Sequence, residues 1–238
     1  MKQFLRQLFI SFVIFGSITA CGSDNSGANP VNSNSSNMVP NTSLSNNNNL
    51  ATMNLEQKLL EFSIEPLTQN EIDDLLWIRE EEKLAADVYQ ALANLHGLKI
   101  FTNISDSEIT HTEAVRLLLN RYSIEDPAIS TAMGVFTDQN LQKLHDDLVD
   151  AGTPTVDEAL VVGAMIEELD IYDLKVAIDR LSNNEDIKMV YENLTKGSRN
   201  HLRSFYKQIT NRGGSYEPIY ISQEEFLSIV NSSMEKGD

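Results

Sequence analysis

The feature that most constrains the fold is the spacing of apolar residues between Thr68 and Gly97. Apolar side chains recur there at every third or fourth position, which is the period of an amphipathic helix. Thr68-Gln-Asn-Glu71 has the spacing of a capping box, a motif that begins helices, and glycine is the residue type that most often ends them. The sequence therefore predicts a long helix over residues 68–97.

Three more long helices and one short helix are predicted, over residues 103–122, 155–181, 184–212 and 138–151. No convincing β-alternation occurs elsewhere in the sequence. Four long helices, with a loop and a short helix between the second and the third, predict an all-α four-helix bundle with one long crossover. The bundle would occupy residues 54–216, and residues 217–238 would form a C-terminal extension. Helical spacing alone fits an ordinary bundle equally well.

Residues 1–20 have the pattern of a secretory signal peptide. Lys2 and Arg6 make a short basic start, an apolar run follows, and small residues lead into Cys21. This ending resembles the lipobox of bacterial lipoproteins, which implies cleavage before Cys21 and lipidation of its thiol. A plain signal peptide with an incidental cysteine and a short membrane anchor are the alternatives, although the apolar run is short for a membrane span.

Residues 21–53 are rich in Asn and Ser, with almost no charge and no apolar periodicity. Such a segment cannot bury a core, so we expect a flexible tether between a lipid anchor and the folded part. The expected location is the cell envelope after export. Gly22 follows the cysteine where Asp would retain many Gram-negative lipoproteins at the inner membrane, which favours the outer membrane if the cell has one.

The formal net charge of −17 argues against binding to nucleic acid or anionic lipid head groups, and it favours local enrichment of cations. Its simplest interpretation is a solvated acidic surface. Cys21 is the single cysteine in the chain. The folded part therefore has no disulfide and no cysteine-ligated metal.

One Glu-x-x-His motif lies in the second predicted helix, at Glu108 and His111. This spacing places a carboxylate and an imidazole one turn apart on the same face, as in half of a di-metal site. Two structural interpretations compete with a metal site. Ser105 and Glu108 have the spacing of a capping box if the helix begins late, and a buried histidine commonly binds a backbone carbonyl.

Acids and a second imidazole also interrupt the apolar faces of the other three helices. Glu82 lies on the inner stripe of the first helix, where it would either bind a cation or border the core beside a basic residue, whereas Glu80 and Glu81 are expected nearer the polar side. Glu167 interrupts the stripe of the third helix. The remaining candidates are Asp170 at the edge of that stripe, Glu168 as a second choice on a flanking face, and His201 on the inner stripe of the fourth helix, whose neighbours Arg199 and Arg203 are expected to face outward.

The sequence from residue 71 to residue 216 resembles the ferritin-like DUF2202 family. The matching blocks are Glu80-Glu-Glu-Lys-Leu-Ala85, Ser107-Glu-Ile-Thr-His111, Gly134-Val-Phe136, Ile166-Glu-Glu-Leu-Asp-Ile171 and Gly197-Ser-Arg-Asn-His-Leu202. In the wider rubrerythrin and ferritin superfamily, Glu-x-x-Ala-x-x-x-Tyr on the first helix carries a metal ligand, and Glu82, Ala85 and Tyr89 fit that spacing. The resemblance implies a ferritin-like fold and the ligands Glu82, Glu108, His111, Glu167 and His201, with Asp170 as a sixth.

The fourth helix departs from the superfamily pattern. A second Glu-x-x-His is expected there, but this chain has Ser198 in place of the glutamate. The ligand set suits one or two ions of iron or manganese. We therefore expect a metal-binding protein, with a di-metal oxidase or peroxidase activity left open. The alternative is a non-catalytic, surface-tethered interaction module with a degenerate site. A closed storage cage fits poorly with a tether, whereas a homodimer remains open.

Overall fold

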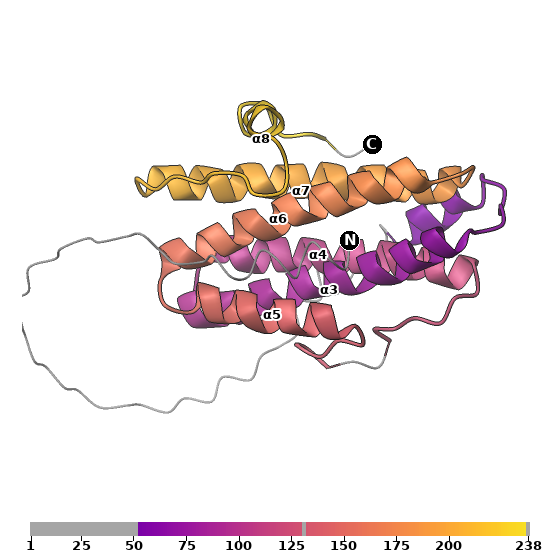
Figure 1. Ribbon diagram of the computed structural model, residues 1–238, viewed down its shortest axis with the longest axis horizontal. Helices are drawn as coiled ribbons and strands as arrows, with labels where there is room; N and C mark the ends of the chain where they lie inside the picture. Colours follow the sequence, from indigo (N-terminus) through magenta and orange to yellow (C-terminus); the bar gives the residue numbers. More distant parts are fainter. Residues whose placement is uncertain (1–51, 130–131, 237–238) are drawn as a thin grey trace, which may run out of the picture. The chain divides into compact units, whose positions relative to one another are not determined.

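The computed structural model describes residues 52–129 and 132–236, and every regular element in these ranges is a helix. The predicted all-α fold is therefore confirmed. Figure 1 shows four long helices running side by side. They are α3 (Gln69–His96), α4 (Lys99–Arg121), α6 (Val156–Arg180) and α7 (Glu185–Asn211). Cys21, the expected signal peptide and nearly all of the expected tether lie outside the described residues.

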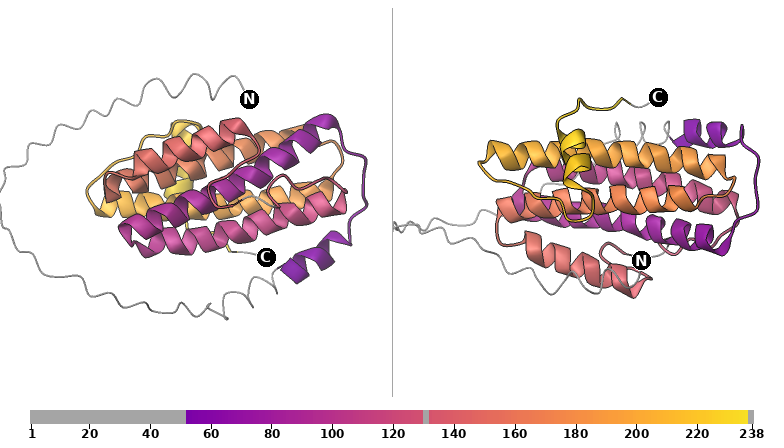
Figure 2. Two further views of the ribbon diagram at one scale, coloured as in Figure 1. Left: turned by 90° about the horizontal axis from the view of Figure 1, so that it is seen from below. Right: turned by 45° about the horizontal axis from the view of Figure 1, so that its top comes forward.

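Each long helix packs against two others. α3 packs along α4 and α6 packs along α7, while α3 also contacts α6 and α4 also contacts α7. A shorter helix, α5 (Gln139–Gly152), covers α3 and α6, and α8 (Gln223–Val230) crosses the outside of α7, as Figures 1 and 2 show. None of the helices in the described part of the chain is long and apolar enough to cross a membrane.

The predicted boundaries of the first helix agree with the structure. Thr68 accepts a hydrogen bond from the Glu71 amide, and the Glu71 carboxylate accepts one from the Thr68 amide, which completes the capping box. Gly97 ends the helix with φ of 69°, in the left-handed region that favours glycine. The helix thus holds the predicted register, and that register decides which acids of α3 face inward.

The second helix begins earlier than predicted, at Lys99 instead of residue 103. Ser105 therefore lies inside α4, and its hydroxyl donates to the carbonyl oxygen of Ala86 on α3 at 2.9 Å. Phe101 and Ile104 are buried in the first turns, which explains the earlier start. The capping-box interpretation of Glu108 is wrong as a result, and this glutamate is a mid-helix residue.

The expected tether extends to residue 53, whereas a short helix already covers residues 52–59. Leu59 of this helix is buried in the core, and Leu55 packs against the same core. Within the predicted C-terminal extension, Ser222 caps α8 by accepting a hydrogen bond from the Glu225 amide. In both cases apolar contacts with the long helices stabilise an element that is short on its own.

Buried apolar residues form two groups, which lie on opposite sides of the middle of the molecule. One group contains residues such as Leu75, Leu118 and Tyr191 from three of the long helices. The other contains Tyr89 and Phe205, whose ring centroids lie 5.3 Å apart, together with Phe101. The acids and histidines singled out from the sequence lie on the stretches of helix between these two groups.

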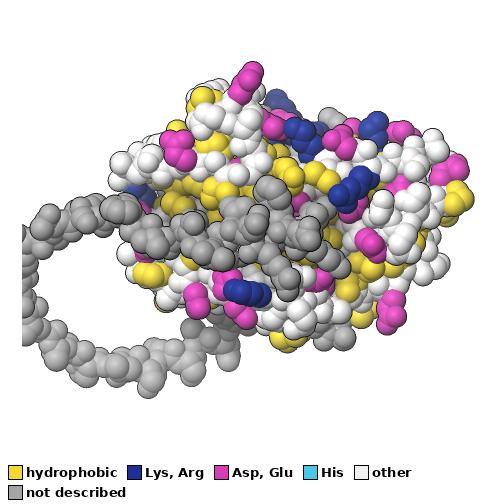
Figure 3. All heavy atoms as spheres, in the orientation of Figure 1, with side chains coloured by type: hydrophobic (Ala, Val, Ile, Leu, Met, Phe, Trp, Pro, Cys, Tyr) yellow, Lys and Arg dark blue, Asp and Glu magenta, His cyan; other side chains and the backbone are white. Residues whose placement is uncertain are grey.

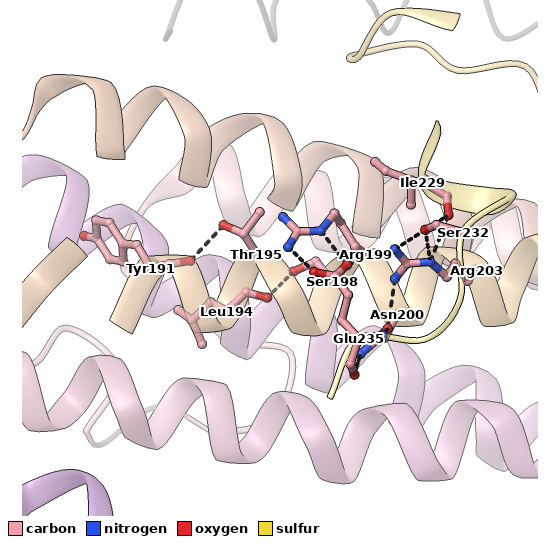
Figure 4. A network of polar contacts seen from close by, with 10 residues as sticks. All are labelled: Tyr191, Leu194, Thr195, Ser198, Arg199, Asn200, Arg203, Ile229, Ser232 and Glu235. Carbon is pink, nitrogen blue, oxygen red and sulfur yellow. Dashed lines mark hydrogen bonds and ion pairs between the residues drawn. The ribbon is translucent and has the colours of Figure 1, made fainter. Parts of the chain in front are cut away.

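The C-terminal extension is held by an arginine pair on α7, drawn in Figure 4. Arg199 binds Glu235 with its Nε atom 2.7 Å from Oε1, and Arg203 contacts the same carboxylate at 2.8 Å. Arg203 also donates to the carbonyl oxygen of Ile229. The expectation that both arginines face outward is therefore wrong for Arg203, which is buried under the extension. Acidic side chains are spread over the face drawn in Figure 3, as expected for a solvated acidic surface.

Candidate metal centre

Five side chains from the four long helices meet in the interior between the two apolar groups. They form two clusters in which the candidate ligand atoms lie within 4.8 Å of one another. One cluster contains Glu82, Glu108 and His111, and the other contains Glu108, Glu167 and His201. Each helix contributes through the face predicted from its apolar stripe. The structure thus brings together the five residues that we expected from the sequence to be ligands.

The first cluster is centred on the imidazole of His111. Its Nδ1 atom lies 2.6 Å from Oε2 of Glu108, one turn earlier on α4, and 3.2 Å from Oε2 of Glu82 on α3. Within the described ranges this ring makes no hydrogen bond to a backbone carbonyl, so the alternative of a buried histidine that binds a carbonyl is not supported. Glu82 likewise pairs with an imidazole here and not with a lysine or an arginine.

The second cluster is centred on the imidazole of His201. Its Nδ1 atom lies 2.7 Å from Oε1 of Glu108 and 3.3 Å from Oε2 of Glu167. The two imidazole rings stack with their centroids 5.5 Å apart. Glu108 therefore directs one carboxylate oxygen to each histidine.

The close contact between Glu108 and His201 lacks the alignment of a hydrogen bond. Among the described residues, neither Oε1 of Glu108 nor Nδ1 of His201 has a hydrogen-bond partner, although the two atoms are only 2.7 Å apart. Oε1 of Glu82 is also buried and has no hydrogen-bond partner among the described residues. Ligand atoms that surround a common cation have this geometry, because their lone pairs point at the ion and not at each other.

Burial makes the charge of this cluster costly. Glu82, Glu108 and Glu167 are at most 2% exposed, and among the described residues their ion-pair partners are the two histidines. Buried carboxylates that lack a compensating cation destabilise a fold by several kcal/mol. The cluster therefore needs bound protons or bound cations to be stable.

The pKa values of the cluster reflect this balance. Burial raises the pKa of Glu82 to about 7, against the opposing charge of His111. Burial also acts to raise the pKa of Glu108, but the charges of His111 and His201 outweigh it and hold that pKa well below its usual range. Burial acts to lower the pKa of His201, while the nearby carboxylates Glu108 and Glu167 raise it to about 10. Without a metal ion, protons held on the imidazoles neutralise part of the carboxylate charge.

Neighbouring residues orient the candidate ligands. The phenol of Tyr89 donates to Oε1 of Glu167 at 2.5 Å, and Nε2 of His201 lies 3.1 Å from the hydroxyl oxygen of Ser107. Outer contacts of this kind fix the rings and carboxylates of metal sites in one orientation. The Ser107 contact uses the ring nitrogen that faces away from Glu108, so it directs Nδ1 towards the cluster.

Gly197 on α7 is a supporting residue that the sequence reasoning did not select. A Cβ atom built on this residue would lie 2.6 Å from both Nε2 and Cε1 of His111. The imidazole therefore fits against α7 because position 197 has no side chain. A glycine inside an otherwise helical pattern is the sequence signal that pointed to such close packing.

Asp170 lies beside the two clusters without belonging to either. Burial raises its pKa well above the usual range, and the charges of Glu82 and Glu108 add to this effect. Its Oδ2 atom contacts the hydroxyl of Ser198, while its Oδ1 atom is buried without a hydrogen-bond partner among the described residues. The serine that replaces the expected glutamate of the fourth helix therefore contacts a carboxylate from α6.

The other three acids considered from the sequence lie outside the clusters. Glu168 faces the C-terminal extension and accepts hydrogen bonds from the Tyr216 hydroxyl and from the amides of residues 219–221. Glu80 accepts from the amides of residues 137 and 138, at the start of α5. Glu81 lies next to Asp173, and the burial of its carboxyl raises its pKa well above the usual range. The expectation that Glu80 and Glu81 lie near the polar side is wrong, because both are only 3% exposed.

Comparison with known proteins identifies the family. Residues 71–233 match the profile of the uncharacterized protein domain DUF2202. The chain belongs to the DUF2202 family. It is 49% identical over 173 residues to the uncharacterized protein MJ0754 of Methanocaldococcus jannaschii, a match that covers 73% of this chain and 93% of the relative. It is also similar to the crystal structure of hypothetical protein MJ0754, with a TM-score of 0.72, 48% identity, and coverage of 73% of this chain and 99% of that one. The matched region of the DUF2202 chain includes all five residues of the two clusters.

Proposed function

We propose that this DUF2202 protein binds one or two divalent metal ions, iron or manganese, in the interior of a ferritin-like four-helix bundle. The observation that carries the proposal is the unaligned 2.7 Å approach of Oε1 of Glu108 to Nδ1 of His201, both buried and both without a hydrogen-bond partner in the described residues. Two unprotonated acceptors repel each other at this distance, whereas a proton on the imidazole or a cation shared by the two atoms makes the approach favourable, and the lack of hydrogen-bond alignment favours the cation. Carboxylate oxygens combined with imidazole nitrogens suit iron and manganese.

The arrangement of the helices supports the ferritin-like part of the proposal. The connection from α4 to α6 is the long one and contains α5, whereas the other connections between the long helices are short. One long crossover is the connectivity of ferritin-like bundles, in which metal ligands project inward from facing helices. The two histidines here come from α4 and α7, and Glu108 supplies the shared carboxylate.

Different residues would bind each of the two ions. Glu82 and His111 would hold one ion, Glu167 and His201 would hold the second, and Glu108 would contact both. Asp170, next to Ser198, would supply the carboxylate that the fourth helix lacks. A bound iron pair would supply redox chemistry towards small oxidants such as dioxygen or peroxide. The protein would contribute a buried position, fixed ligands and exclusion of bulk water.

The same proposal includes export and a lipid anchor on Cys21. Its support is the sequence of residues 1–21, since the described residues begin at 52. The Asn- and Ser-rich segment that follows would separate the metal-binding part from the membrane.

Elemental analysis of the purified mature protein, loaded anaerobically with ferrous iron and desalted, tests the proposal. We expect one or two ions per chain for the wild type, and loss of binding in Glu108→Gln. Glu113→Gln is the matched control, because Glu113 lies on the same helix and pairs with Arg116 at the surface. No bound metal in the wild type, or equal metal in both variants, would overturn the proposal and favour a tethered interaction module.

A further inference from the structure

A small cavity lies against the outer side of His111, where α4 and α7 meet the short helix 52–59. Its volume is about 220 Å³. The apolar part of its lining comes from Leu55, Ala114, Leu117, Val190 and Leu194, and two threonines and an asparagine complete it with His111. The cavity therefore touches one residue of the proposed metal centre and is otherwise mostly apolar.

His111 separates this cavity from the carboxylate clusters. Its Nδ1 edge contacts Glu82 and Glu108, while Nε2 faces α7 at Gly197. Gly197 follows the cavity residue Asn193 by one helical turn. The His111 side chain is 13% exposed, in contrast to the three nearly inaccessible carboxylates. A molecule in the cavity would therefore reach the ring of His111 without crossing the acids.

The lining selects against charged ligands. Apart from the imidazole of His111, no basic or acidic side chain lines the cavity among the described residues, although the whole chain has a formal charge of −17. Moving a charged group from water into an apolar pocket is costly when no opposite charge compensates it. A volume of about 220 Å³ is several times the roughly 30 Å³ that one water takes up in the liquid, so the cavity has room for a small molecule.

We infer that this cavity is the access and holding site for a small uncharged molecule, of the class of dioxygen and hydrogen peroxide, beside the metal centre. The inference rests on the proposed function, because it assigns the small ligand of that same centre. Metal ions would have to reach the carboxylates by another route.

The outer wall of this site comes from a segment that precedes the family match. Thr52 and Leu55 line the cavity, whereas the match to DUF2202 begins at residue 71. Leu59, one turn further along the same helix, is 3% exposed and joins the core, so it holds the wall in place. The segment that continues from the expected tether would therefore also limit access to the centre.

The effect of closing the cavity tests the inference. Ala114→Phe would fill it, and Ile109→Phe is the matched control because Ile109 is exposed on the same helix. The first measurement is the rate at which nitric oxide, a small uncharged probe, associates with the ferrous protein. We expect Ala114→Phe to slow association by about one decade or more, with unchanged metal content, and Ile109→Phe to match the wild type.

The second measurement needs no metal. Crystals of the metal-free wild type under xenon pressure are expected to show a xenon atom in the cavity, and crystals of Ala114→Phe are expected to show none. A wild type without bound metal would overturn the proposed function, while the xenon result would still test the cavity. Bound metal together with equal nitric oxide rates in Ala114→Phe and the wild type would overturn the access site alone.

If Ala114→Phe does not fold, as circular dichroism would show, Leu55→Ala provides the opposite change. Removing that side chain enlarges the cavity at its outer wall, so nitric oxide association should become faster. An unchanged rate in folded, metal-loaded Leu55→Ala would contradict the inference.

Discussion

Two adjacent glutamates on α6 have opposite surroundings. Glu167 and Glu168 are both at most 1% exposed. Glu168 receives hydrogen bonds from a phenol and from backbone amides of the C-terminal extension, all of them neutral donors. Glu167 receives one from Tyr89 and otherwise faces His201 and the carboxylate of Glu108. Burial alone therefore does not distinguish the acids of the proposed centre, whereas the number of neutral donors does distinguish these two neighbours.

The same contrast recurs on α3. Glu80 accepts two backbone amide hydrogen bonds at the start of α5, and a carboxylate in that place also interacts favourably with the helix dipole. Glu82, two residues later, has His111 as its partner, and its other oxygen has no hydrogen-bond partner in the part of the chain that the structure describes. On each of the two helices, one buried acid holds a neighbouring segment while a nearby acid belongs to the proposed centre.

The largest expected effect is a stabilisation by metal that depends on Glu108. A ligand that binds only the folded state stabilises it by about 4 kcal/mol when free ligand is about 1,000 times its Kd. We expect ferrous or manganous ion to raise the free energy of unfolding of the wild type by this order. The increase should vanish in Glu108→Gln, as urea unfolding with and without metal would measure. An equal increase in the variant would show that the stabilisation by metal does not depend on Glu108.

Replacing Glu168 should lower the stability of the fold without changing its metal content. Glu168→Leu leaves several buried donors of the C-terminal extension without an acceptor, so we expect a loss of about 3 kcal/mol in the free energy of unfolding. Metal content should remain that of the wild type, because Glu168 lies outside both clusters. Urea unfolding and elemental analysis of the same sample measure the two quantities. A loss of metal from a folded Glu168→Leu protein would show that the two acids act together.

A smaller effect is expected from Gly197→Ala. The added methyl group would meet the ring of His111 at 2.6 Å and push it from its position, so we expect metal affinity to fall about tenfold. Alanine favours a helix by about 1 kcal/mol over glycine, so the metal-free protein should not lose stability to the same degree. Competition with a coloured chelator measures the affinity, with Lys207→Ala on the exposed part of α7 as the control. Unchanged affinity would show that the ring can move without loss.

The smallest effect concerns the arginine pair that holds the C-terminal extension. Hydrogen bonds from Arg199 lower the pKa of Glu235 to about 2, with a further contribution from Arg203. A lowered pKa contributes stability that is complete above the ordinary value of 4.5 and is lost as pH falls towards 2. Because solvent screens this partly exposed group, we expect Glu235→Gln to cost about 1 kcal/mol at pH 7. The difference from the wild type should shrink between pH 5 and pH 2 in urea unfolding, and a constant difference would exclude the ion pair as its source.

Much of the fold could be predicted from local patterns. Helical spacing, the cap at Thr68 and the stop at Gly97 are properties of short segments, and the structure agrees with them. The early start of α4 was missed because it depends on the burial of Phe101 and Ile104 against other helices. The helix at residues 52–59 was missed for the same reason, since its few apolar residues become informative only beside the core.

The candidate site was predictable where an acid or a histidine interrupts an apolar stripe. This applies to Glu82, Glu167 and His201, and the Glu-x-x-His spacing added Glu108 and His111. The burial of Glu80 and Glu81 was not predictable from α3 alone, because α5 and Asp173 of α6 create their surroundings. Whether a buried acid meets amides or other acids is decided by segments distant in the sequence.

Anomalous diffraction from crystals soaked in ferrous iron under anaerobic conditions tests the central claim most directly. We expect iron peaks in contact with the Glu108 carboxylate, one on the side of His111 and, if two ions bind, a second on the side of His201. Glu168 should show no peak in the same crystals. Iron found only at surface carboxylates, with none beside Glu108, would show that the buried cluster is not a metal centre.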